Sequence, residues 1–274
     1  MAISSGLTLV FGVLRVINFA HGAMYMLGAF LAYSVVRWFA SIPGINFWLA
    51  LIIAPILVAI IAGIIEFVFL RRIYVREHLY QLLLTSALVY IISDIAKISW
   101  GTMPVNVPKP AVISGSLMLW GATIPGTQIF LTALSALVGI LLWLFLYKTK
   151  YGNLIRAAAA DAEMTQALGI DCSKLYMAVF MMGCWLAAVG GVGSTTILKP
   201  IVGMDADVIL LCFIVIVVGG MGSLVGALIG SLLIGQVESI GILVVPRLPV
   251  VLVFSLMTVV LIARPWGLFG IKQR

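Results

Sequence analysis

With 64% hydrophobic and only 9% charged residues, this chain of 274 residues carries more apolar surface than a soluble domain buries, since soluble domains contain about 25% charged residues. Its net charge of +7 comes from basic residues in short clusters between apolar runs, without interleaved aromatic residues, which argues against nucleic-acid binding and fits loops beside a membrane. The composition predicts an all-α, polytopic transmembrane helical bundle, a single domain over residues 1–274 in contact with membrane lipid.

The chain opens on a short apolar stretch. Residues 2–14, AISSGLTLVFGVL, are too few to cross a membrane, which takes about 20 apolar residues. No charged segment precedes them and no cleavage site follows them, so they do not have the form of a signal peptide. They have the form of the end of a longer helix. We therefore expect the natural reading frame to extend upstream of Met1 and the N-terminal helix to be truncated.

A polar cluster follows this stretch. Arg15 is expected at a membrane interface, and Asn18, His21 and Gly22 precede the return to apolar sequence. Polar groups inside a membrane are costly, and they often line a cavity or satisfy a helix break. Asn18 and His21 therefore either close a helix junction or lie near a substrate path.

Clear transmembrane candidates come next in the chain. They are five apolar runs, at about 19–36, 46–70, 79–100, 128–147 and 175–197. Charged residues inside these runs are expected to have structural roles. Glu66 is expected to extend to the inner surface near Arg71 and Arg72. Asp94 and Lys97, three residues apart, are expected to pair on one helix face.

The C-terminal third is ambiguous. A long apolar stretch at about 207–237 is interrupted by GGMGS, Gly219 to Ser223, and a last apolar run covers about 248–263. Glycine favours close helix packing and a tight turn, so we predict three short crossings with turns near Gly222 and Val237. A single broken helix followed by a re-entrant segment is the alternative. The whole chain then has about eight membrane segments.

Basic residues predict the orientation, because lysine and arginine concentrate in cytoplasmic loops. The loop at 148–174 and the C-terminus are expected inside, and the loop at 101–127 outside. Eleven basic residues are then inside: Arg15, Arg71, Arg72, Arg76, Lys148, Lys150, Arg156, Lys174, Arg264, Lys272 and Arg274. Four are outside: Arg37, Lys109, Lys199 and Arg247.

The loop at 148–174 contains signals for a helix of its own. Asp161 is a suitable N-cap residue, Ala162 to Leu168 are mostly good helix formers, and Gly169 suits the position after the helix end. Small residues, including the alanines at 157–160, would let such a helix dock into a groove on a soluble partner. A solvated connector between two spans is the alternative.

Enzyme signatures are missing from the sequence. There is no GK dipeptide, hence no phosphate-binding loop, and neither HExxH nor GxSxG occurs. Cys172, Cys184 and Cys212 lie far apart, as do His21 and His78, so we expect no metal site and no cofactor. If energy drives this protein, another chain supplies it.

Three stretches resemble the LivH-type permeases of branched-chain amino acid ABC importers. The first is GLTLVFGVLRVINFAHGAMYMLGAF, Gly6 to Phe30, which closely resembles the hallmark run of that family. The others are RAAAADAEMTQALGI, Arg156 to Ile170, and VVGGMGSLVGALIGSLLIGQVES, Val217 to Ser239. With matching hydropathy between them, the resemblance covers nearly the whole chain, although family members usually carry additional residues before the segment corresponding to Ala2.

The resemblance implies an ABC importer permease fold in the bacterial inner membrane. It also implies four kinds of partner: a second, LivM-like permease, two LivG/LivF-like ATP-binding subunits, a periplasmic substrate-binding protein and membrane lipid, with no nucleic acid. The implied substrates are leucine, isoleucine and valine, and a urea or short-chain amide importer is the alternative. A stand-alone carrier and an intramembrane enzyme find less support, because neither a proton relay nor a catalytic constellation is evident.

Two sets of site residues follow. Those expected to couple to the ATP-binding subunits are Arg156, Ala157, Asp161, Ala167, Leu168, Gly169 and Ile170. Those expected near the substrate path are Asn18, His21, Gly22, Gly219, Gly220, Gly222 and Ser223.

Overall fold

A computed structural model of the chain describes residues 1–14, 16–42, 44–74, 76–119, 122–244 and 248–270. Arg15, Arg247, Lys272 and Arg274, which entered the predicted orientation, lie outside the described residues. The α-helices are α1 (Ala2–Leu14), α2 (Ala20–Trp38), α3 (Asn46–Val68), α4 (His78–Trp100), α5 (Gly126–Lys148), α6 (Lys150–Ala160), α7 (Ala162–Ala167), α8 (Cys172–Ser194), α9 (Met204–Gly219), α10 (Leu224–Val244) and α11 (Pro249–Ala263). Two 3-10 turns, η1 (Leu70–Arg72) and η2 (Ala111–Ile113), and two strands, β1 (Ser116–Leu119) and β2 (Ala122–Pro125), complete the fold.

Within the described residues, five helical segments are long and apolar enough to cross a membrane: Asn46–Arg72, His78–Trp100, Gly126–Lys148, Cys172–Ser194 and Leu224–Val244. Four of them confirm runs predicted from the sequence, and the fifth lies in the ambiguous C-terminal third. The chain is therefore a multi-pass helical membrane protein. The total of about eight membrane segments stays a prediction.

Helix α2, on which the run at 19–36 falls, has 19 residues but is not apolar enough to be among these five. It packs against α3, α4, α8 and α9. Gly28 lets its backbone approach α8, since a Cβ there would lie 2.7 Å from the Cα of Ala188. A helix surrounded by protein needs small residues more than lipid-facing hydrophobic ones. Its modest hydropathy therefore reflects a central position.

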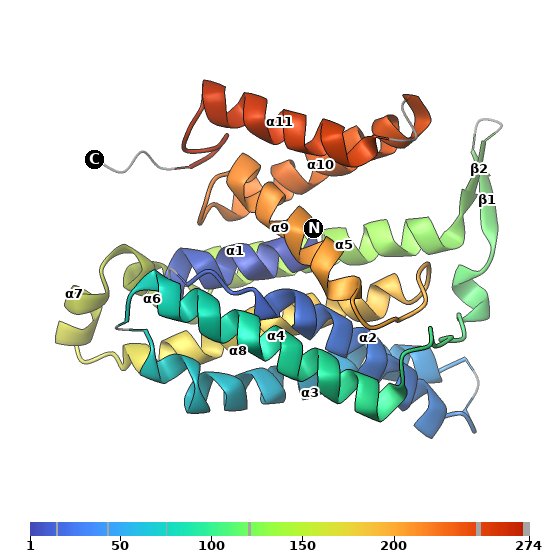
Figure 1. The fold of residues 1–274 in the computed structure, drawn as a ribbon, viewed down its shortest axis with the longest axis horizontal. Coiled ribbons are helices and arrows are strands. Elements are labelled where there is room, and N and C mark those ends of the chain that lie inside the picture. Colours follow the sequence, from blue (N-terminus) through green and yellow to red (C-terminus); the bar gives the residue numbers. More distant parts are fainter. Residues whose placement is uncertain (15, 43, 75, 120–121, 245–247, 271–274) are drawn as a thin grey trace.

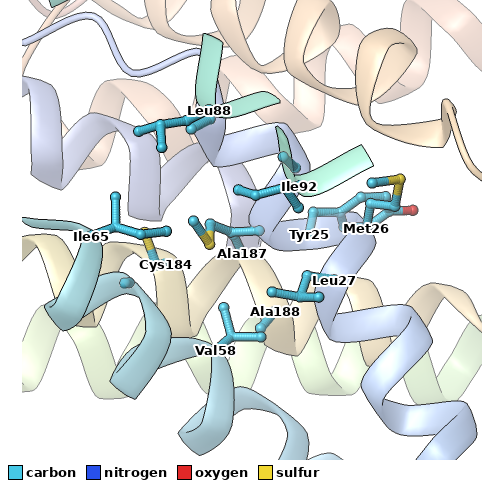
Figure 2. Packing of buried hydrophobic residues seen from close by; sticks show 14 of the residues in the cluster. Tyr25, Met26, Leu27, Val58, Ile65, Leu88, Ile92, Cys184, Ala187 and Ala188 are labelled. Carbon is cyan, nitrogen blue, oxygen red and sulfur yellow. The ribbon is translucent and has the colours of Figure 1, made fainter. Parts of the chain in front are cut away.

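The main core surrounds α2. Figure 2 shows Tyr25, Met26 and Leu27 of α2 beside residues from three of its four neighbours. The labelled neighbours are Val58 and Ile65 of α3, Leu88 and Ile92 of α4, and Cys184, Ala187 and Ala188 of α8. One buried core thus holds segments far apart in the sequence.

The loops lie at two opposite ends of the bundle. In Figure 1, α7 lies at the left end, together with the turn between α9 and α10, whereas the β1–β2 hairpin lies at the right end. The loops at 148–174 and 101–127 are thus on opposite sides, as the basic-residue pattern requires. Which side faces the cytoplasm stays a prediction.

The C-terminal third forms three helices, α9, α10 and α11, rather than one broken helix, but the turn predicted near Val237 is wrong because α10 continues to Val244. The turn between α9 and α10 depends on glycine. Gly220 and Gly222 have φ angles of 104° and 81°, in the left-handed region that side chains other than glycine rarely adopt. The predicted tight turn at the GGMGS sequence is therefore confirmed.

The hairpin was not predicted. Strands β1 and β2 pair antiparallel, with Ser116 opposite Pro125 and Leu117 opposite Ile124. Each strand has only four residues, too few for an alternating pattern to stand out in a loop. The fold is otherwise helical, as expected.

Candidate functional site

The break between α1 and α2 contains the first predicted site residues. Asn18 and His21 are both completely buried. The Nε2 atom of His21 lies 3.0 Å from the carbonyl oxygen of Ile3. A carbonyl only accepts hydrogen bonds, so the tautomer that bonds here carries its proton on Nε2. This bond ties the start of α2 to the start of α1, as the helix-junction interpretation expects.

Several polar atoms at this break lack a hydrogen-bond partner among the described residues. They are Nδ1 of His21 and both side-chain polar atoms of Asn18. Buried polar groups are nearly always hydrogen-bonded in native proteins, so this cluster is unusual. The substrate-path interpretation of Asn18 and His21 therefore stays open beside the junction interpretation.

Gly22 brings the N-terminal end of α9 against this cluster. A Cβ at Gly22 would lie 2.7 Å from the carbonyl oxygen of Asp205 and 2.9 Å from Cβ of Ile209. Asp205 is buried, and its Oδ1 lacks a partner within the described part of the chain. The sequence analysis missed Asp205, although an acidic residue opening an apolar run, directly after the Gly203 turn, was a visible signal.

The second predicted group on the substrate path, Gly219 to Ser223, lies elsewhere. Gly222 packs on α1, because a Cβ at Gly12 would lie 3.2 Å from the Cα of Gly222. Ser223 accepts a hydrogen bond from the backbone N–H of Gly226 at 3.0 Å, at the start of α10. His21 contacts α1 at Ile3, nine residues and about 14 Å along the helix from Gly12. The structure therefore does not gather the two groups into one pocket.

Close backbone packing explains the remaining glycines of this turn. Gly219 lies against Gly226 of α10. Gly220 lies against Gly267 and Gly270 in the segment after α11, where the backbone N–H of Phe269 donates to the carbonyl of Gly219 at 3.0 Å. These glycines let three segments meet at one point, which is a packing role.

A cavity of about 120 Å³ lies between α1, α5, α6 and the glycine turn. Its lining includes Thr8, Gly12, Arg156 and Gly222. The guanidinium of Arg156 donates to Oδ1 of Asn153 at 2.7 Å and lies 4.7 Å from the ring centroid of Tyr147. Arg156 thus belongs to α6 and points back toward α5, away from the predicted coupling helix.

Helix α7 begins and ends where the sequence predicts. Oδ1 of Asp161 accepts a hydrogen bond from the backbone N–H of Met164 at 2.9 Å, an N-cap contact. Gly169 has a φ of 83°, and its N–H donates to Gln166 at 2.9 Å after the helix end. The prediction of a separate short helix is confirmed, one residue shorter than expected, with Leu168 as its C-cap.

Apolar side chains project from this short helix. Met164 is 60% exposed and Leu168 is 75% exposed, outside the candidate membrane spans. Ala157 and Ala167 are exposed, while Ile170 is half-buried. Exposed large apolar groups on a loop beyond the membrane are typical of a protein contact.

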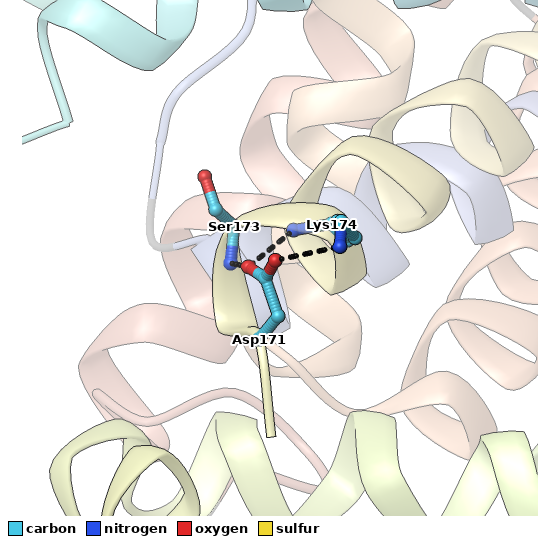
Figure 3. A network of polar contacts seen from close by, with 3 residues as sticks. All are labelled: Asp171, Ser173 and Lys174. Carbon is cyan, nitrogen blue, oxygen red and sulfur yellow. Dashed lines mark hydrogen bonds and ion pairs between the residues drawn. The ribbon is translucent and has the colours of Figure 1, made fainter. Parts of the chain in front are cut away.

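Asp171 is the N-cap residue of α8. Its Oδ1 accepts from the backbone N–H groups of Ser173 and Lys174 at 3.1 and 3.2 Å, and its Oδ2 lies 3.2 Å from Nζ of Lys174 (Figure 3). The backbone N–H of Lys174, followed by its side chain, holds the pKa of the Asp171 carboxyl below its usual value. These contacts fix the start of α8 directly after the loop that contains α7.

Two predictions concerned charged residues in the spans: the one for Glu66 is wrong, and the one for Asp94 and Lys97 is confirmed. Glu66 does not extend to the inner surface but is completely buried, because the segment after η1 folds back and the hydroxyl of Tyr74 donates to Oε1 at 3.1 Å. Asp94 and Lys97 do pair, at 2.9 Å. In the described part of the chain, no group of three or more His, Cys, Asp or Glu residues is arranged to hold a metal ion.

Comparison with known proteins finds one matching family model and several similar transport permeases. A family model described as branched-chain amino acid transport system / permease component matches residues 1–263. The high-affinity branched-chain amino acid transport system permease protein BraD of Pseudomonas aeruginosa is 32% identical over 98% of this chain and 90% of the relative. LivH of Salmonella typhimurium is 28% identical over the same shares, and the probable LivH of Methanocaldococcus jannaschii is 27% identical over 98% and 88%. No solved structure matches.

Proposed function

This chain belongs to the family of branched-chain amino acid transport system permease components, and from that membership we propose that it is the permease subunit of an ATP-driven importer for leucine, isoleucine and valine. It forms the membrane passage and hydrolyses no ATP itself. Its place is the bacterial inner membrane.

The observation that carries the proposal is the extent of the similarity. The alignment with BraD covers 98% of the chain, and so includes nearly all of the helices, the α1–α2 break and α7. The relatives reported above bear branched-chain amino acids in their names. That favours this substrate class over urea and short-chain amides.

The partners follow from the role. A second, homologous permease completes the passage, two ATP-binding subunits attach on the cytoplasmic side, and a periplasmic binding protein delivers the amino acid. The proposed docking element is α7 with its flanking residues. Exposed Met164 and Leu168 would fill a groove on an ATP-binding subunit, and the small side chains of Ala157 and Ala167 would allow close approach. The movement would pass to α8 through the short link at 168–171 and through the contact of the Cys172 thiol with the carbonyl oxygen of Ala162 at 3.7 Å.

The proposed substrate path runs beside the α1–α2 break. Asn18 and His21 are completely enclosed, so substrate would reach them only after α2 and α9 separate at Gly22. The glycine turn at 219–223 would then act as a pivot between α9 and α10. Closure of the ATP-binding subunits would drive this rocking, and tight substrate binding would belong to the binding protein.

Uptake by the reconstituted importer tests the substrate class. Proteoliposomes containing this chain, its partner subunits and the binding protein should take up radiolabelled leucine when ATP is supplied. Excess isoleucine or valine should compete, while urea and acetamide should not. Competition by urea or acetamide, with none by valine, would move the chain to the amide importers.

A further inference from the structure

The face of α4 that points away from the bundle contains a polar stripe. Helix α4 packs on α2, and its buried residues, Gln81, Thr85, Leu88, Ile92 and Ala96, recur at intervals of three or four residues. At 100° per residue, the outward side carries a second series with the same spacing. Its members, all exposed, are Leu83, Ala87, Tyr90, Asp94 and Lys97.

The polar members of this stripe are well exposed. Tyr90 is 73% exposed, and the side chains of Asp94 and Lys97 are 67% and 48% exposed although they pair at 2.9 Å. Ile91, Ile95 and Ile98 are exposed beside the stripe, so the outward side of α4 is only partly polar. Two other spans expose no charged residue along their middle. The large residues exposed there are apolar: Ile52, Ile56, Ile60 and Ile64 on α3, and Leu137, Ile140, Leu141, Trp143 and Leu144 on α5.

The polar residues of this stripe lie far enough from the end of α4 that facing lipid would be costly. The 23 residues of α4 rise about 34 Å, slightly more than the hydrocarbon thickness of about 30 Å. Asp94 lies about 9 Å and Tyr90 about 15 Å before the end of the helix at Trp100. Charged side chains at such depth normally face water or other protein, not hydrocarbon.

We infer that the polar stripe of α4 lines the water-filled passage, and that its Asp94–Lys97 pair meets the charged end of the transported amino acid. This inference rests on the proposed function. A zwitterionic amino acid presents an ammonium and a carboxylate close together. The Asp94 carboxylate complements the ammonium of the amino acid, and the Lys97 ammonium complements its carboxylate. Without substrate, Asp94 and Lys97 pair with each other, so neither charge is left without a partner. Unlike His21, both are accessible in this conformation.

Thiol labelling of the complete importer in proteoliposomes tests where this stripe points. Single cysteines replace Ala87, Tyr90 or Asp94, and the matched controls replace Ile60 of α3 or Ile140 of α5, which are exposed near the middle of their spans. The native cysteines are all buried, so the parent protein supplies the background. A membrane-impermeant maleimide should react about tenfold faster or more on the α4 stripe, because a thiolate forms only in contact with water.

The depth of the reactive positions distinguishes a water-filled passage from the membrane surface. If position 94 reacts while positions 87 and 90 behave like the Ile60 and Ile140 controls, the ion pair only meets lipid headgroups and the inference is overturned. Equal reactivity of all α4 positions and controls overturns it as well. The labelling does not depend on which molecule is transported, so it stands or fails separately from the substrate class.

Transport then tests the ion pair. Asp94→Asn and Lys97→Gln should each lower the leucine uptake rate about tenfold, the loss of one charge-assisted contact, while Asp94→Glu should retain most of it. Copurification of the partner subunits serves as the assembly control. Normal uptake by Asp94→Asn in an assembled importer would contradict recognition of the amino acid by this pair.

Discussion

At the scale of single residues, buried polar groups concentrate where helices break. His21 bonds to the carbonyl of Ile3, Thr85 of α4 donates to the carbonyl of Ile17 at 3.4 Å, and Tyr74 donates to Glu66. Each of these contacts satisfies a backbone or side-chain group that would otherwise be buried unpaired, at a cost of about 1–3 kcal/mol. The breaks are thus stabilised by side chains rather than left to the membrane.

Replacement of His21 separates its two interpretations. His21→Leu removes the bond to Ile3 and should slow leucine uptake without preventing assembly, while lowering thermal stability by about 1–3 kcal/mol. His21→Gln, whose amide can also donate to a carbonyl, is the matched control for the bond. Uptake rates and thermal unfolding of the purified importer provide the measurements. Normal uptake by His21→Leu would leave the residue with a structural role only.

At the scale of elements, glycine decides how closely helices approach. Gly22→Ala should disrupt the contact of α2 with α9, because the new Cβ would lie 2.7 Å from a backbone oxygen of Asp205. We expect a loss of about 1–3 kcal/mol, measured by thermal unfolding. Gly235→Ala on α10 is the control, since no atom lies within 4 Å of its added Cβ. Equal unfolding temperatures for the two variants would refute the close-packing role of Gly22.

Helix α7 carries the prediction about coupling. Ala167 is exposed, so Ala167→Trp should leave folding and membrane insertion unchanged. It should weaken association with the ATP-binding subunits or abolish stimulation of their ATPase activity by substrate. The same change at exposed Ala111, at the other end of the bundle, should have no effect. If Ala167→Trp assembles and is stimulated like wild type, coupling occurs elsewhere.

Local signals predicted some elements well. Asp161 and Gly169 placed α7 to within one residue, because capping depends on a few neighbouring atoms. Helix α6 was not predicted as a separate helix, since α5 ends at Lys148 and α6 begins at Lys150, a bend of one residue with little sequence signature. The burial of Glu66 also escaped prediction, because it depends on how the segment after η1 folds back. The acidic residue at 205 was visible in the sequence, but its position beside Gly22 and the polar stripe of α4 required knowledge of which helices are neighbours.

At the scale of the whole molecule, the chain is organised by its two ends. The short helix α7 and the β1–β2 hairpin lie at opposite ends, with the spans between them. Cysteines at Gly115 and Asn153, both exposed, provide a direct test of orientation. An impermeant thiol reagent added to intact cells should label position 115 only. Labelling of position 153 from outside would invert the predicted topology.

The central claim is that this chain is a passage that works only when ATP-binding subunits drive it. Leucine uptake should therefore be compared between proteoliposomes that contain the complete importer and proteoliposomes that contain this chain alone. The account predicts ATP-dependent accumulation by the complete importer and neither accumulation nor leucine counterflow by the isolated chain. Counterflow of leucine through the isolated chain would contradict the account and identify a stand-alone carrier.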